Sequence, residues 1–199
     1  IVLPGEYDII SEYKSHFGAN YFEDYAADYN NEVNGFYDDG IPIDNISIRF
    51  ESGAKVTAHY RGNNQNVKKY FSAFAVAQNA VIDVLVLDAS ELRYGLHVDY
   101  HRDKVETLEI KNCDLHHYKQ GDADKNNNQA IGAGLGINST WTIENCIFRS
   151  DTDNPVVRIH NNLADNSCSK VNISNCYVVG SGYILLNSYS TSNQMTTAL

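Results

Sequence analysis

The chain has 199 residues, of which 43% are apolar, so it is long enough to form one domain with a hydrophobic core. Its formal charge of −10 argues against general binding to nucleic acid or to an anionic membrane surface. The sequence has no run of about 18 uninterrupted apolar residues, so we expect neither a membrane span nor a membrane partner.

The first 40 residues show little regular patterning. The chain starts at Ile1, without Met and directly in a strand-like segment, so we expect it to be a piece of a longer chain. Residues 1–40 are predicted to form an irregular leading region. The one helix-like pattern is YFEDYAADY, which predicts a short helix near residues 21–29.

From residue 41 onward apolar residues alternate with polar ones, which is typical of strands with one buried face. One set of short strands ends in turn-type residues, at 46–50, 85–87, 108–110, 141–143 and 171–173. A second set follows within the same repeats, at 94–101, 130–137, 156–162 and 183–189. Self-similar units of this kind are the signature of a β-solenoid.

The pattern Ile-x-Asn-Cys occurs three times and ends at Cys113, Cys146 and Cys176, 33 and then 30 residues apart. Equivalent positions of a solenoid stack, so these thiols are predicted to form one inward column of reduced cysteines. The preceding asparagines are predicted to occupy a bend in the left-handed conformation and to hydrogen-bond along the stack. A β-sandwich or a jelly roll would not require this repetition.

Several stretches resemble one family of proteins. They are LPGEYDI at the start, IDNISIRFESGAKV, LDASELRYGLHVDY, AIGAGLGINSTWTIENCIF and VVRIHNN. They are similar to segments of the pectate-lyase-like right-handed parallel β-helix proteins, especially those of tailed-phage and prophage tails or baseplates. The resemblance covers nearly the whole chain, least well residues 11–40 and the last ten.

The resemblance implies an all-β, single-stranded right-handed parallel β-helix that forms one domain over residues 1–199, with stacked coils at 41–190. It implies a place in the virion, in a phage tail, or otherwise outside the cell or on its surface. Other virion tail proteins are then expected partners, and the resemblance also admits a homotrimer. The chain lacks the set of catalytic Asp, Lys or Arg residues of pectate lyases and polygalacturonases, so we predict no catalytic residue.

The alternation also predicts side-chain directions in the second strand set: Leu96, Ile131 and Val157 are expected to face inward, and their neighbours along each strand outward. Glycines fill the outward positions of 130–137, which would leave a bare floor between polar walls and allow a sugar ring to approach the backbone. The predicted glycan-binding residues are His97, Asp99, Gly134, Arg158 and His160. Their donors and acceptors suit hydroxyl groups.

Other interpretations of these residues stay open. The histidines are equally suited to an ordinary surface, and the glycines to contact with a neighbouring chain. His97, Asp99 and His101 form a weak metal pattern, and residues 121–128 resemble a calcium loop only superficially, so we predict no metal and no cofactor. A glycosidase would need a carboxylate pair, for which Asp99 with Glu91 or Asp103 is not compelling.

Three functions fit the sequence. The first is a phage structural or receptor-binding module that contacts a host surface polysaccharide. The second is a polysaccharide lyase or glycoside hydrolase on the same scaffold, and the third is a secreted bacterial adhesin. The fold alone cannot choose among them.

Overall fold

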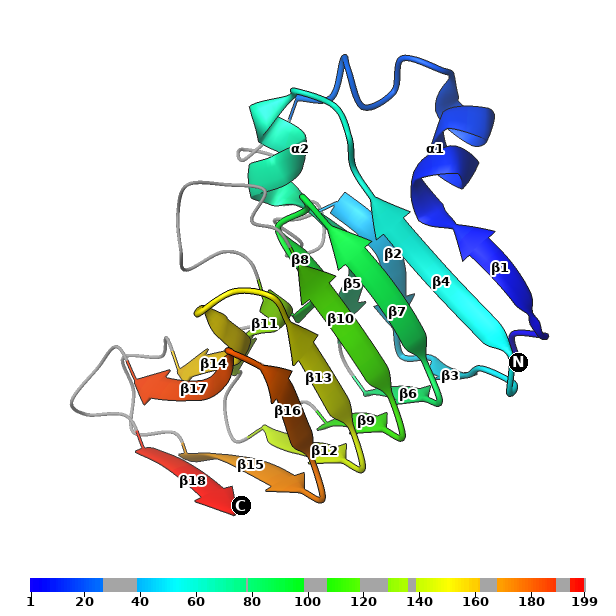
Figure 1. Ribbon diagram of the computed structural model, residues 1–199. Helices are drawn as coiled ribbons and strands as arrows, with labels where there is room; N and C mark the ends of the chain where they lie inside the picture. The colour runs from blue at the N-terminus through cyan, green and yellow to red at the C-terminus, as the bar shows by residue number, and fades with distance from the viewer. Residues whose placement is uncertain are drawn as a thin grey trace.

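The computed structural model describes residues 1–26, 39–77, 79–98, 107–118, 129–135, 139–161, 168–188 and 194–198. In these residues the chain forms three six-stranded parallel sheets and two short helices (Figure 1).

Each sheet takes every third strand of the chain. The first sheet contains β1 (Gly5–Asp8), β4 (Ala54–His59), β7 (Val86–Ser90), β10 (Asp114–Tyr118), β13 (Ile147–Ser150) and β16 (Tyr177–Gly180). The second contains β2 (Asp39–Asp44), β5 (Phe71–Ala77), β8 (Tyr94–Val98), β11 (Gln129–Leu135), β14 (Pro155–Asn161) and β17 (Tyr183–Ser188). The third contains β3 (Ser47–Arg49), β6 (Ala80–Asp83), β9 (Thr107–Lys111), β12 (Thr140–Glu144), β15 (Cys168–Ser174) and β18 (Gln194–Ala198).

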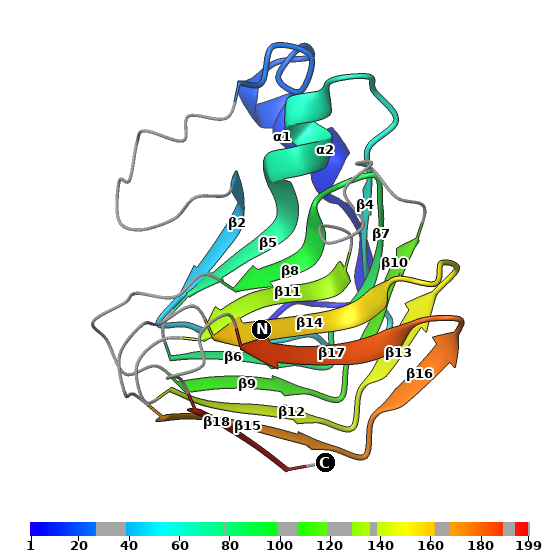
Figure 2. The same cartoon turned by 90° about the vertical axis from the view of Figure 1, so that its left-hand side faces the viewer.

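This order makes the molecule a parallel β-helix. The chain runs through the second, third and first sheet in turn and then repeats, so successive coils stack as Figure 2 shows. The predicted all-β solenoid is therefore confirmed. No helix in the described part of the chain is long and apolar enough to cross a membrane.

The interior of the solenoid is filled by apolar columns, one residue from each coil. On the second sheet Leu96, Ile131 and Val157 lie in register on neighbouring strands and are fully buried. The inward direction that the alternation predicted for these residues is confirmed. Such in-register columns bury a continuous core that no single coil could bury alone.

The corner between the third and the first sheet holds the repeated cysteines. Cys113 and Cys146 are buried, Cys176 is half-buried, and all three are free thiols. A hydrogen bond with the thiol of Cys113 is the main cause that raises the pKa of Cys146 to about 12. The predicted column of reduced cysteines is confirmed.

The asparagine before each of these cysteines adopts the left-handed conformation, with φ of 56°, 55° and 49° at Asn112, Asn145 and Asn175. The Nδ2 group of Asn145 donates to Oδ1 of Asn112 at 3.2 Å, and Nδ2 of Asn112 donates to Oδ1 of Asp83 at 2.7 Å. Asparagine tolerates this backbone conformation better than most residues, so the sequence signal and the bend agree.

The N-terminal end carries the two helices, α1 (Ile9–Phe17) and α2 (Gln65–Tyr70). The prediction of a helix near residues 21–29 is wrong over its described part, because residues 21–26 form turns and irregular structure and residues 27–29 lie outside the described residues. The helix lies earlier because the Asp8 side chain caps its N-terminus and Gly18, with φ of 110°, ends it.

The aromatic residues of the mispredicted segment pack instead of forming a helix. Phe22 is fully buried, and its ring meets that of Phe71 edge to face at 5.1 Å. The leading region expected to be irregular thus contains a strand, a helix and part of the core.

Candidate functional site

The predicted ligand face is the outer surface of the second sheet. His97 of β8, Gly132 of β11 and Arg158 of β14 lie side by side in one register row, and Gly134 lies beside His160 in the next. The structure therefore brings four of the five predicted residues onto neighbouring strands. Asp99 and the side chain of His160 lie outside the described residues.

The glycine floor of this face is filled at Gly132 by a side chain of the protein itself. A Cβ atom on Gly132 would overlap the ring of Tyr94. That ring stacks on His97, with centroids 4.9 Å apart, and lies 5.0 Å from the guanidinium carbon of Arg93. His97 is only 8% exposed. Ligand binding by the predicted set stays a prediction.

The first sheet lies toward the viewer in Figure 1, and its outer face carries a second set of polar residues. Asp88, His116 and Arg149 lie in one register row on β7, β10 and β13. His116 lies between two carboxylates, 3.3 Å from Asp88 through Nδ1 and 3.4 Å from Asp151 through Nε2. Arg149 donates two hydrogen bonds of 2.7 Å to Asp114, whose carboxylate raises the pKa of Arg149.

His59 of β4 lies in register with Ser90 of β7, two residues beyond Asp88 on the same face of the sheet. Its Nδ1 atom is 2.8 Å from Oγ of Ser90, and its Nε2 atom is 3.5 Å from Oδ2 of Asp88. Asp88 thus faces two histidines, His59 from one neighbouring strand and His116 from the other. A hydroxyl, an imidazole and a carboxylate arranged in this way can take up, hold and return a proton.

The sequence alone did not point to these residues as a cluster, because they come from separate coils. His59 and Ser90 are 31 residues apart and meet only because β4 and β7 pair in the observed register. The sequence signal that could have found them is that each residue occupies an outward position of an alternating strand, and that these strands belong to successive coils.

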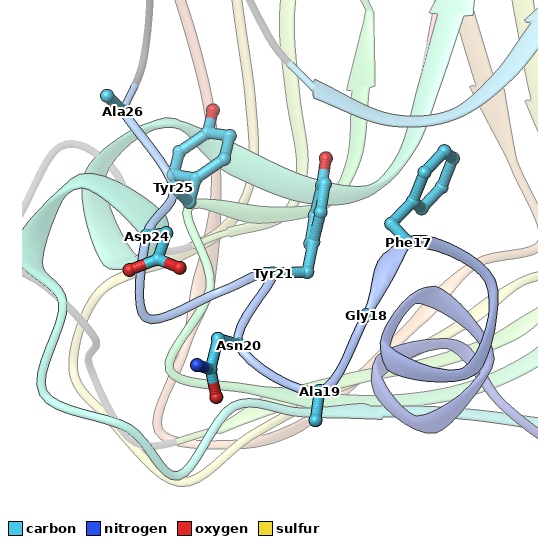
Figure 3. Close-up of a pocket in the computed structure, with 8 residues that line it drawn as sticks. All are labelled: Phe17, Gly18, Ala19, Asn20, Tyr21, Asp24, Tyr25 and Ala26. Carbon is cyan, nitrogen blue, oxygen red and sulfur yellow. The ribbon is translucent and has the colours of Figure 1, made fainter.

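A shallow depression of 660 Å³ lies at the N-terminal end (Figure 3). Its rim carries the rings of Phe17, Tyr21 and Tyr25, with centroids 5.1 Å apart for the first pair and 6.3 Å for the second. Asn20 and Asp24 add polar groups. Phe17 is 59% exposed and Tyr21 is half-buried, whereas Tyr25 is buried. The accessible surface of the first two rings, beside polar side chains, suits a flat polar ligand such as a sugar ring.

Two further depressions connect this end to the first sheet. One, of 550 Å³, shares Tyr25 with the first depression. The other, of 500 Å³, shares Glu23, Tyr60 and Gly62 with the 550 Å³ depression. It is also lined by His59. A polar and aromatic surface therefore runs from α1 to the His59 end of the first sheet.

Among the described residues, no group of three or more His, Cys, Asp or Glu side chains has an arrangement suited to a metal ion. Comparison of the chain with models of known protein families, with curated proteins and with solved structures finds no match.

Proposed function

We propose that this β-helix is a binding module of a phage tail or baseplate that contacts a host surface glycan. The observation that supports glycan contact is the row of Asp88, His116 and Arg149 along the solenoid axis, with His59 of the adjacent outward row in contact with Asp88. Neighbouring strands are about 4.8 Å apart, so the row offers donors and acceptors at a spacing close to that of successive sugar units.

Charge narrows the class of glycan. The chain has 25 acidic and 15 basic residues, and Asp8, Asp24 and Glu23 line the depressions at the N-terminal end. A strongly anionic polysaccharide would be repelled by this surface at low ionic strength. The proposed ligand is therefore a neutral or amino-bearing surface polysaccharide.

The place in a virion rests on the resemblance of segments such as LDASELRYGLHVDY to phage tail and baseplate β-helices. From the same resemblance we propose other tail proteins as partners and a homotrimer as the assembly. The alternative function is that of a polysaccharide lyase or glycoside hydrolase. The experiment below distinguishes it from binding alone, because it measures both retention and cleavage of polysaccharide.

The experiment is retention of the protein on a panel of immobilised bacterial surface polysaccharides, with reducing ends measured in parallel. His116→Ala should weaken retention at least tenfold, because a hydrogen bond to a charged group contributes about 1.5–3 kcal/mol. Lys170→Ala, an exposed change on the third sheet, is the matched control and should leave retention unchanged.

Other outcomes would redirect or overturn the proposal. Loss of retention on Arg158→Ala but not on His116→Ala would place the ligand on the outer face of the second sheet. Release of reducing ends would favour the hydrolase or lyase. Failure of every neutral and amino-bearing polysaccharide to retain the protein would overturn glycan contact.

A further inference from the structure

We propose that Ser90 is an activated nucleophile that removes acyl ester groups from the glycan, with His59 as its base. The nucleophile is argued from the geometry alone, whereas the substrate class rests on the proposed glycan contact.

The hydroxyl of Ser90 has a potential base as its hydrogen-bond partner. Its Oγ atom lies 2.8 Å from Nδ1 of His59, an imidazole that reaches it from the neighbouring coil. Ser150 is the instructive contrast, because it is a buried serine at the end of another strand of the same sheet. Ser150 donates to the backbone carbonyl of Thr152 at 2.9 Å, a partner that satisfies the hydroxyl and offers no base. A serine becomes nucleophilic only beside a base.

A carboxylate contacts the other side of the His59 imidazole. The Nε2 atom of His59 is 3.5 Å from Asp88, which His116 contacts from the other side at 3.3 Å. A proton on Nε2 that faces this carboxylate leaves the Nδ1 lone pair directed at the serine hydroxyl. Hydroxyl, imidazole and carboxylate then form the sequence of groups that serine hydrolases use on unrelated folds.

The backbone directly after Ser90 is strained. Glu91 directly after Ser90 has φ of 56°, a conformation that non-glycine residues rarely adopt. It is held by an ion pair of 2.8 Å with Lys68, in which both side chains are largely buried. Ser90 is therefore followed directly by a strained backbone conformation, of the kind that accumulates at functional sites.

Access comes from the side of His59. Ser90 is only 6% exposed, but His59 lines the 500 Å³ depression, as do Arg61 and Gly62. A small acyl group entering there would approach the serine past the imidazole. Arg61 supplies a positive charge in the same depression, which favours the negative charge that develops on an ester oxygen.

The reaction balances without another reagent. Oγ of Ser90 attacks the carbonyl carbon while Nδ1 of His59 takes the hydroxyl proton. The intermediate expels the sugar oxygen, which takes that proton, and an acyl-serine remains. Water then attacks the acyl carbon and gives a proton to His59, and collapse releases the carboxylic acid and returns the proton to Ser90.

The first test is labelling with a fluorophosphonate probe, mapped by mass spectrometry of peptides. We expect labelling at Ser90, none on Ser90→Ala, and a rate at least 100-fold lower on His59→Gln, since a general base contributes about 10²–10⁴-fold. Ser150→Ala should label as the unchanged protein does. Labelling at other serines, or equal rates with and without His59, would overturn the nucleophile. Melting temperatures establish that each variant is folded.

The second test separates this inference from glycan contact. Release of acetate from O-acetylated polysaccharide, followed by proton NMR, should disappear in Ser90→Ala while retention on the same polysaccharide persists. Asp88→Asn should lower kcat at least tenfold for p-nitrophenyl acetate with little change in KM, as expected of a positioning residue. Labelling at Ser90 without acetate release from any retained polysaccharide would overturn the substrate class. Retention without labelling would overturn the nucleophile and leave the proposed function standing.

Discussion

Two neighbouring coils turn the same corner with different residues. Between β9 and β10 the corner is Asn112-Cys113, whereas between β6 and β7 it is Val84-Leu85. The backbones nevertheless agree, with φ of 56° at Asn112 and 62° at Val84. Their amides make equivalent bonds of 3.0 Å to the next coil, from Asn112 to Glu144 and from Val84 to Lys111. Strand pairing therefore imposes the bend, and asparagine only makes it less costly.

The side chains record what the substitution changes. Asn112 accepts from Asn145 and donates to Asp83, so the amide ladder ends on a carboxylate in the coil that has Val84. Leu85 fills the position of the cysteines and is fully buried. The same two coils differ again further along, where buried His117 in β10 lies in register with Ala89 in β7.

The largest expected effect comes from the difference between His117 and Ala89. Burial lowers the pKa of His117 to about 4 from 6.5, although a hydrogen bond to the carbonyl of Leu92 partly opposes it. In the unfolded chain the imidazole of His117 takes up a proton below pH 6.5, whereas in the folded protein it does so only near pH 4. The stability that His117 contributes is therefore complete above pH 6.5 and is lost as the pH falls toward 4, by on the order of 3 kcal/mol.

Urea unfolding of the protein and of His117→Ala at pH 7 and pH 4 measures this effect. The difference in unfolding free energy between the two should move by about 3 kcal/mol in favour of the variant on acidification. The two proteins share every other titrating group, so the contributions of those groups cancel in the difference between them. Parallel pH profiles would show that the imidazole is not kept neutral by the fold.

Leu85→Cys tests whether the two corners are interchangeable in their packing. The change removes about two carbon atoms from a fully buried side chain, so we expect a loss of about 2–3 kcal/mol from transfer and cavity terms. Val86→Ala, at the exposed neighbouring position, should cost less than about 0.5 kcal/mol. Equal shifts of the urea midpoint would mean that this corner is loosely packed.

Asn112→Val places the residue of one corner into the other. It removes the amide that bonds Asp83 and Asn145 and introduces a β-branched residue in the left-handed region, with an expected loss of about 2 kcal/mol. Asn63→Val, at an exposed loop position, is the matched control and should change the unfolding free energy little. A melting shift no larger than that of the control would remove any role for the amide ladder.

These residues also explain what the sequence could predict. The Ile-x-Asn-Cys repeat predicted the corner, because local conformation and stacking both act on the same asparagine. The alternation of apolar and polar residues predicted that Leu96 and Ile131 face inward. Contacts between coils were not predictable, because segments of different length separate the strands and leave their register open. The cluster of His59, Asp88 and Ser90 depends wholly on that register.

Two other features could not be predicted from the pattern of a single segment. The glycines of β11 do suit close approach, but Tyr94 of the preceding coil occupies the space at Gly132, which single-strand patterning cannot show. The aromatic spacing at residues 21–25 is helical, yet Phe22 and Tyr25 are buried against Phe71 in a non-helical segment. At residues 21–25 tertiary packing outweighed a weak local preference for helix.

The substitution with the smallest expected effect is at Val84, and it is expected to increase the stability of the protein. A β-branched residue at φ of 62° is strained by roughly 1–2 kcal/mol, and asparagine is among the residues that tolerate this conformation. Val84→Asn should therefore raise the unfolding free energy by about 1 kcal/mol, after some loss of half-buried apolar surface. Val84→Gly relieves the same strain without an amide, so a larger gain with asparagine would assign the excess to hydrogen bonding with the next coil. A loss on both substitutions would mean that Val84 contributes more by packing than its backbone costs, and that the Asn-Cys corner is favoured for its side chains alone.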